Sequence, residues 1–226
     1  KEEYPYQTSW GTTTRMIGGL IMVHSDDYGL VLPPKIAPKQ VVIIPIKMTE
    51  KVMEKSQSIK NLLLENDIEA YIDDSEKSAG FKFAEAEVNG IPIRIEIGER
   101  DLLNNNLVFV RRDTREKITV PVDTDILKYT KELLDRIQND MYNRALERRN
   151  SLTFEAHSLK DIEDILNKQP GFIHAMWCGN KECEEKIKEI KGCKSRCILE
   201  DEQPIDDKCV CCGEKAKHHV IWGIQY

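Results

Sequence analysis

The chain has 226 residues, a formal net charge of −6 and a hydrophobic fraction of 40%. This composition indicates an ordinary globular protein that is long enough for two domains. It excludes a membrane-spanning protein, because apolar runs such as 41–45 are too short, and residues 1–5 do not resemble a signal peptide. An acidic chain binds RNA only through a local basic patch.

The first feature along the chain is a run of small and hydroxyl residues, TSWGTTT (8–14), that leads into Arg15. An extended run that ends in a guanidinium is suited to holding a polyphosphate, because the group donates paired hydrogen bonds and carries fixed charge. From the chemistry alone, Arg15 is either such a clamp or one partner of a buried ion pair. Residues 15–24 are predicted to form a buried helix, whose glycines 18 and 19 indicate close packing against a sheet.

A polar group, His24-Ser25-Asp26-Asp27, follows this helix. It is compatible with a catalytic or metal site, but a histidine beside acids is more often a helix end with its capping residues, which we favour. Only 14 residues precede Arg15. We therefore expect the segment up to residue 37 to be the end of a preceding domain. Pro33-Pro34 and Pro38 mark a linker at its end.

The next segment predicts one compact α/β domain in the order strand, helix, strand, helix, strand, strand, helix. The expected strands are 40–46, 68–72, 91–97, 107–112 and 117–122, the last two forming a hairpin. The expected helices are 50–66, with Thr49 as the N-cap, 80–88 and 123–149. Strict alternation in IPIRIEI places Arg94 and Glu96 on the polar face of their strand.

Beyond Asn150 the composition changes. Ser158 begins a capping box and a helix that Pro170-Gly171 ends. Residues 172–177 are predicted to form a strand that leads to Cys178. A helix over 181–190 follows, and a short strand over 218–226 closes the chain.

All seven cysteines lie beyond residue 177. An odd count at one end of an unsecreted chain indicates metal ligands or free thiols over disulfides. Cys178 and Cys183 are separated by four residues, and Cys209 and Cys212 by two. Two short-spaced pairs with neighbouring glycines are typical of zinc knuckles, so we predict a structural four-sulfur zinc site.

The alternative is a set of reduced, unligated thiols. Cys211 is a possible substitute for Cys209 or Cys212, but its spacing to either is wrong for a knuckle. Cys193 and Cys197 are interpreted as ordinary small residues. A redox site is disfavoured, because no CxxC follows a thioredoxin-like strand.

Four segments, in order, resemble one known family. TSWGTTTRMIGG and MVHSDDYGLVLPPKIAPKQVVIIPI are similar to the third signature motif and domain junction of class II aminoacyl-tRNA synthetases, specifically the prolyl-tRNA synthetases of the archaeal and eukaryotic-like type. AGFKFAEAEVNGIPIRIEIGERD, followed by VRRDTREK, resembles the anticodon-binding domain of that family. The cysteine pairs and the aromatic end of the chain resemble its appended zinc-binding domain. The resemblance covers the whole chain.

The resemblance implies three parts. Residues 1–37 are expected to be the end of the class II antiparallel catalytic sheet. Residues 38–150 are expected to be a mixed five-stranded α/β anticodon-binding domain, and 151–226 a small α+β zinc-binding domain. The implied function is proline–tRNA ligation: ATP-dependent activation of L-proline to prolyl-adenylate, with Mg²⁺, and transfer to tRNA(Pro). The implied parent enzyme is a cytoplasmic homodimer with structural zinc and no membrane association.

The resemblance also implies residue roles in adenylation. Arg15 is the catalytic arginine on the ATP γ-phosphate, and Thr13 contacts the nucleotide. Ser9, Trp10 and Gly11 lie on the strand that floors the proline pocket. These roles suit the chemistry, because carboxylate attack on the α-phosphate expels pyrophosphate and needs fixed positive charge. Tyr226 and its terminal carboxylate are implied near the active site, although a frayed terminus is commoner.

Glu87, Arg94 and Arg100 match positions that face the anticodon in this family. Arginine pairs bidentately with guanine edges and glutamate accepts from guanine N–H groups, and proline anticodons carry two guanines. The structural alternative makes Glu87 a solvated helix end and Arg94 the outer face of a strand. The sequence departs from the family at Thr12, at Ala79-Gly80 and at residues 98–101, and none of these changes removes a proposed ligand.

The family's first two motifs and its proline-selective loop precede the third motif and are not in this sequence. We therefore expect the C-terminal portion of the enzyme, inactive in isolation. The alternative is a stand-alone RNA-binding or regulatory module without catalysis. In that case the apolar segment 16–23 is an exposed hazard, so we prefer the first interpretation.

Overall fold

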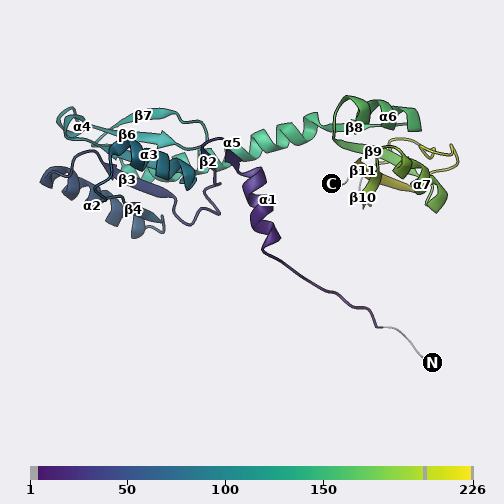
Figure 1. Cartoon of the computed structure of the whole chain (residues 1–226), viewed down its shortest axis with the longest axis horizontal. Helices are drawn as coiled ribbons and strands as arrows, with labels where there is room; N and C mark the ends of the chain where they lie inside the picture. Colours follow the sequence, from purple (N-terminus) through teal and green to yellow (C-terminus); the bar gives the residue numbers. More distant parts are fainter. Residues whose placement is uncertain (1–4, 201–202, 225–226) are drawn as a thin grey trace. The chain divides into compact units, whose positions relative to one another are not determined.

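The computed structural model describes residues 5–200 and 203–224. The chain divides into two compact units, the first ending at Tyr142 and the second beginning at Asn143 (Figure 1). Each unit has its own sheet. No helix in the described ranges is both long and apolar enough to cross a membrane.

The first unit begins with an exposed segment without regular structure, 5–14, that leads into helix α1 (Arg15–Val23). A short hairpin follows, made of β1 (Ser25–Asp26) and β2 (Gly29–Leu30). The predicted helix is confirmed, but its predicted burial is wrong, because no residue of α1 is buried and Met22 is 81% exposed. A methyl group added at Gly18 or Gly19 would meet nothing within 4 Å. The apolar helix thus finds no packing partner in the described parts of the chain.

A mixed five-stranded sheet follows, as predicted. Its strands lie in the spatial order β4 (Ala70–Ile72), β3 (Val41–Pro45), β5 (Ile93–Ile97), β6 (Asn106–Arg111) and β7 (Lys117–Pro121). The first three are parallel, and the predicted hairpin of β6 and β7 is antiparallel.

Four helices accompany this sheet: α2 (Glu50–Leu64), α3 (Ala79–Val88), α4 (Glu99–Leu103) and α5 (Ile126–Ser151). One face of the sheet packs on α2 and α5 in a core that includes Ile43, Ile95 and Phe109. The opposite face packs on α3 through Ala86. Thr49 occupies the predicted N-cap position of α2, although its side chain makes no capping bond.

The predicted solvent exposure of one face of β5 is wrong, because α3 covers that face. Arg94 and Glu96 lie opposite Val42 and Ile44 of β3, on the face that α3 covers. Both side chains are therefore buried, with Arg94 only 6% exposed. The alternation in the sequence indicated an outer polar face, but it carries no sign of a covering helix.

The second unit has a four-stranded sheet in the order β10 (Cys193–Leu199), β11 (His218–Ile224), β9 (Phe172–Trp177) and β8 (Thr153–Glu155). Helices α6 (Leu159–Lys168) and α7 (Lys181–Glu189) accompany it. The Ser158 hydroxyl accepts from the Asp161 N–H at 3.2 Å, as the capping box predicts. Strands β8 and β10 were not expected. Trp222 is fully buried in the small core, together with Ile162 and Ile173.

Candidate functional site

The first unit places a buried ion-pair cluster between α3 and β5. Arg94 donates from Nη1 to Glu87 Oε1 at 3.2 Å and from Nε to Glu96 Oε1 at 3.0 Å. Lys117 Nζ lies 3.3 Å from the second oxygen of Glu96. A guanidinium this deeply buried must have its charge and hydrogen bonds compensated, and the two carboxylates do so.

Phe83 adds an aromatic surface to this cluster. The Arg94 Cζ lies 4.4 Å from the centroid of the Phe83 ring, and Lys117 Nζ lies 5.7 Å from it. Both cations are at distances where the ring quadrupole attracts them. Phe83 and Glu87 share one side of α3 because they are four residues apart. The site therefore combines a half-buried aromatic ring, a guanidinium and a carboxylate whose side chain is 25% exposed.

Two more arginines lie at the end of the neighbouring strand. Arg111 donates to Asp113 and Asp140, and Arg112 donates to Asp26 and to the Glu87 carbonyl oxygen. A small pocket of about 10 Å³ lies here, which is room for about one water molecule. It is lined by Ala86, Glu87, Ile91, Arg94, Val110, Arg111 and Arg112. Burial acts to lower the pKa of Arg111, but the two carboxylates outweigh it and raise that pKa. Arg111 thus keeps its charge.

The sequence-predicted residues do not all meet. Glu87 and Arg94 are in direct contact, whereas Arg100 is an exposed residue of α4, which follows the opposite end of β5. Phe83 and Lys117 were not among the residues predicted from the sequence. The signal for Phe83 was available in its helical spacing to Glu87. Lys117 reaches Glu96 only because β5, β6 and β7 pair side by side, and this pairing could not be predicted from the sequence.

The predicted adenylation residues lie at the start of the described chain. Ser9, Trp10 and Gly11 are exposed and outside any strand, with Trp10 93% exposed. The Thr13 hydroxyl accepts from the Arg15 N–H at 3.4 Å, next to the first turn of α1. Tyr226 lies outside the described residues. The polar group after α1 is a helix end, as favoured, because the His24 N–H caps α1 by donating to Leu20 and the Asp26 carboxylate accepts from Tyr28.

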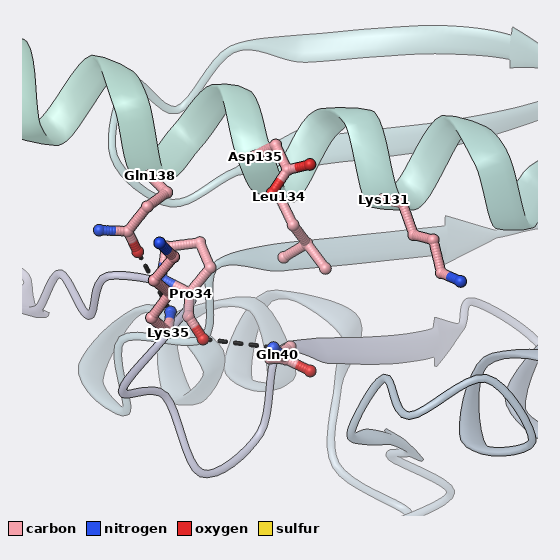
Figure 2. Close-up of a pocket in the computed structure, with 7 residues that line it drawn as sticks. All are labelled: Pro34, Lys35, Gln40, Lys131, Leu134, Asp135 and Gln138. Carbon is pink, nitrogen blue, oxygen red and sulfur yellow. Dashed lines mark hydrogen bonds between the residues drawn. The ribbon is translucent and has the colours of Figure 1, made fainter.

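A wider pocket of about 280 Å³ lies between the proline-rich linker and α5 (Figure 2). Its polar side chains hold the linker in place. Gln138 Oε1 accepts from the Lys35 N–H at 3.1 Å, and Gln40 Nε2 donates to the Pro34 carbonyl at 3.3 Å. These bonds show a structural role for the pocket wall.

The second unit gathers four cysteines at one point. The sulfur atoms of Cys178, Cys183, Cys209 and Cys212 all lie within 4.8 Å of one another. Cys178 is 3.7 Å from Cys183 and 3.8 Å from Cys212. Four sulfurs placed tetrahedrally about 2.3 Å from one zinc ion would be about 3.8 Å apart. The spacing and the all-sulfur donor set therefore fit a structural zinc site.

The local backbone explains why the sulfurs converge. Cys178 directly follows β9, Cys183 lies in the first turn of α7, and the other two occupy the turn before β11. Gly179 and Gly213 have φ of +88° and +73°, which favour glycine, so each pair has a turn residue beside it.

The thiol environments differ within the cluster. Burial raises the pKa of Cys178 and, more strongly, that of Cys183. Burial also acts to raise the pKa of Cys209, but the N–H groups of Cys212 and Cys211 outweigh it and lower that pKa to about 7. Backbone N–H groups directed at a sulfur stabilise the thiolate form that binds a metal. Cys193 and Cys197 lie in β10, and neither belongs to the cluster.

Comparisons with known proteins agree with this division. Residues 40–133 match the family model of the anticodon-binding domain, and residues 159–226 match that of the prolyl-tRNA synthetase C-terminal domain. The chain is a homologue of the proline–tRNA ligases. It is 48% identical over 225 residues to the proline–tRNA ligase of Clostridium novyi (strain NT). This match covers 99% of this chain and 47% of that ligase.

Other ligases give similar values. The proline–tRNA ligase of Lachnoclostridium phytofermentans (strain ATCC 700394 / DSM 18823 / ISDg) is 49% identical over 227 residues, and that of Clostridium botulinum (strain Loch Maree / Type A3) is 48% identical. In both, the match covers 100% of this chain and 47% of the ligase. The chain thus spans about half the length of the proline–tRNA ligases that it matches. The resemblance found in the sequence is confirmed.

Proposed function

We propose that this chain is the anticodon-reading and metal-stabilised part of a proline–tRNA ligase. The complete enzyme activates L-proline with ATP and Mg²⁺ to prolyl-adenylate and transfers the prolyl group to tRNA(Pro). The observation that carries the proposal is the cluster of Glu87, Arg94 and Phe83, in a domain that matches the anticodon-binding family. We retain the domain limits 1–37, 38–150 and 151–226, and a cytoplasmic homodimer, as parts of the same proposal.

The chemistry of the cluster suits a guanine that has left its stack. A carboxylate accepts from the N1–H and N2–H groups of guanine, and a guanidinium donates to its O6 and N7 atoms. Glu87 and Arg94 offer one group of each kind, 3.2 Å apart. The Phe83 ring provides a face for stacking, which contributes about 1–3 kcal/mol per base without regard to sequence. Proline anticodons supply two adjacent guanines.

Arg100 takes a different role in this proposal. It is exposed on α4 and separate from the ion-pair cluster. A solvated arginine on a short helix is suited to a phosphate of the anticodon loop, which positions the RNA without reading a base.

The adenylation roles rest on the family likeness. Arg15 supplies fixed positive charge to the γ-phosphate, with Thr13 next to the nucleotide and Ser9, Trp10 and Gly11 beside the proline. Tyr226 is proposed near the same active site. Positive charge at the leaving pyrophosphate is what this reaction needs from its protein.

Zinc is proposed to be held by Cys178, Cys183, Cys209 and Cys212. A closed four-sulfur site supplies no open coordination position, so its contribution is to folding. The second unit has only a small core around Trp222, and metal binding adds to its stability.

The direct test is RNA binding by this chain at one fixed salt concentration. We expect the anticodon stem-loop of tRNA(Pro) to bind at least about tenfold more tightly than loops in which either guanine is replaced by adenine. Equal affinity for all loops would contradict base reading. Arg100→Ala is expected to weaken binding to every loop by the same factor.

A further inference from the structure

One buried arginine, Arg112, bonds both to the hairpin that follows α1 and to the base-reading helix α3. Arg112 lies just after β6, and its side chain is only 2% exposed. Its Nη1 and Nη2 atoms donate to the two carboxylate oxygens of Asp26 at 2.8 and 2.6 Å. Its Nε atom donates to the backbone carbonyl of Glu87 at 2.9 Å. One buried guanidinium therefore contacts the hairpin and the Glu87 backbone at the same time.

The backbones interlock at the same place. Gly29 of β2 has φ of +131°, and a side chain there would collide with the backbone of Val88. Gly90 has φ of +69°, and a side chain there would collide with Leu30. The Leu32 N–H donates to the Gly90 carbonyl at 3.3 Å. The hairpin and the end of α3 thus touch through reciprocal glycine contacts that leave little room for sliding.

The Arg112–Asp26 pair, with two hydrogen bonds, also opposes movement of the hairpin, because the Arg112 side chain is only 2% exposed although that of Asp26 is 39% exposed. Moving the end of α3 either carries Arg112 and Asp26 with it or breaks the bonds that compensate a desolvated guanidinium. Movement of α3 and the hairpin together therefore costs less free energy than movement of α3 alone. Asp26 is close in sequence to α1, whose first residue is Arg15.

We propose that Arg112 is a positioning residue that couples Glu87, through Asp26, to the hairpin and to α1. Binding of a guanine at Glu87 and Arg94 therefore stabilises the hairpin against local opening, and the effect extends to the helix that begins at Arg15. This inference rests on the proposed anticodon function. Coupling of this kind is reciprocal, so opening of the hairpin weakens RNA binding by the same factor.

The test is amide hydrogen exchange of the 226-residue chain, with and without the anticodon stem-loop of tRNA(Pro). Peptides that cover residues 16–32 report on α1 and the hairpin. Saturating RNA is expected to slow their exchange by about fivefold or more. In Asp26→Asn this response is expected to disappear, while RNA affinity falls by no more than the same factor.

Two further variants separate coupling from loss of structure. Arg112→Lys keeps a cation near Asp26 but cannot hold both Asp26 oxygens and the Glu87 carbonyl, so the hairpin stays in place and its response to RNA shrinks. Asp27→Asn changes an exposed neighbouring acid and is expected to keep the full response.

The outcomes distinguish the two proposals. Failure of the unaltered chain to bind the stem-loop would overturn the anticodon function and this inference together. Binding without slower exchange in residues 16–32 would overturn the inference alone, as would a full response that persists in both Asp26→Asn and Arg112→Lys.

Discussion

Arg94 of β5 and Glu87 of α3 form a pair, 3.2 Å between Nη1 and Oε1, on the helix-covered face of the five-stranded sheet. Glu96 and Lys117 complete the cluster, so two cations face two carboxylates. The formal charges of these four groups cancel. A guanine can satisfy the same donors and acceptors that Arg94 and Glu87 now offer to each other.

Replacing Arg94 by lysine tests the need for a guanidinium. Lys retains the charge that compensates Glu96, but it loses the planar arrangement that pairs bidentately with guanine. We expect Arg94→Lys to lose about 1–3 kcal/mol of discrimination between guanine and adenine loops, and to melt at a lower temperature because an ammonium does not reproduce the two bonds of the buried guanidinium. Filter binding below the melting temperature and thermal unfolding measure the two quantities. Unchanged discrimination would remove Arg94 from base reading.

Zinc content tests the cysteine site. We expect one zinc ion per chain by native mass spectrometry, and its loss in Cys178→Ser with unfolding of the second unit. Cys197→Ser is the matched control, because that exposed cysteine lies outside the four-sulfur cluster. Burial raises the pKa of Cys183, so zinc binding must release its proton and zinc affinity falls as the pH falls. A metal-free chain of unchanged stability would contradict the site.

Acid titration tests the Asp26–Arg112 pair. The hydrogen bond from Arg112 is the main cause that lowers the pKa of Asp26 from 3.8 to about 2. A lowered folded-state pKa adds stability above the unfolded value and loses it as the pH falls from about 4 towards 2. Because Asp26 is partly exposed, we expect only about 1 kcal/mol from the pair. Asp26→Asn should lack this part of the acid dependence when both proteins are unfolded by urea. An identical pH profile for the two proteins would show that the pair adds nothing.

Replacing Gly29 tests the contact between the hairpin and the end of α3. Gly29→Ala is expected to destabilise the hairpin by about 1–3 kcal/mol, because φ is +131° and the new methyl group would meet the Val88 backbone. Gly80→Ala is the matched control, since nothing lies within 4 Å of a methyl group at that helical position. Hydrogen exchange in residues 24–32 is the readout. Equal exchange in the two variants would contradict the tight contact.

The sequence predicted most of the sheet because its strands are continuous apolar runs, as in VVII, or alternate strictly, as in IPIRIEI, and because turn residues separate the elements. It missed β10, whose CKSRCIL pattern mixes charged and apolar residues, and β8, which has only three residues. The cysteine cluster was predictable, since two short-spaced pairs need only one long-range contact to converge.

Other features needed the tertiary structure. The burial of Arg94 depends on α3 covering that face of β5, and the contact of Asp26 with Arg112 joins residues 86 positions apart. The exposure of α1 could not be predicted from the sequence either, because the helix is as apolar as a buried one. An apolar helix needs a packing partner, and the described residues do not provide one.

The most direct test of base reading pairs a change in the protein with a change in the RNA. Inosine lacks the N2 amino group from which Glu87 is proposed to accept. With the unaltered chain, replacing an anticodon guanine by inosine should weaken binding by about tenfold at one of the two positions. With Glu87→Ala, which has no side-chain acceptor, binding of the guanine loop should already be weaker, and the same replacement should cost almost nothing further. An equal inosine penalty in both proteins, at both positions, would contradict the central claim that Glu87 reads a guanine.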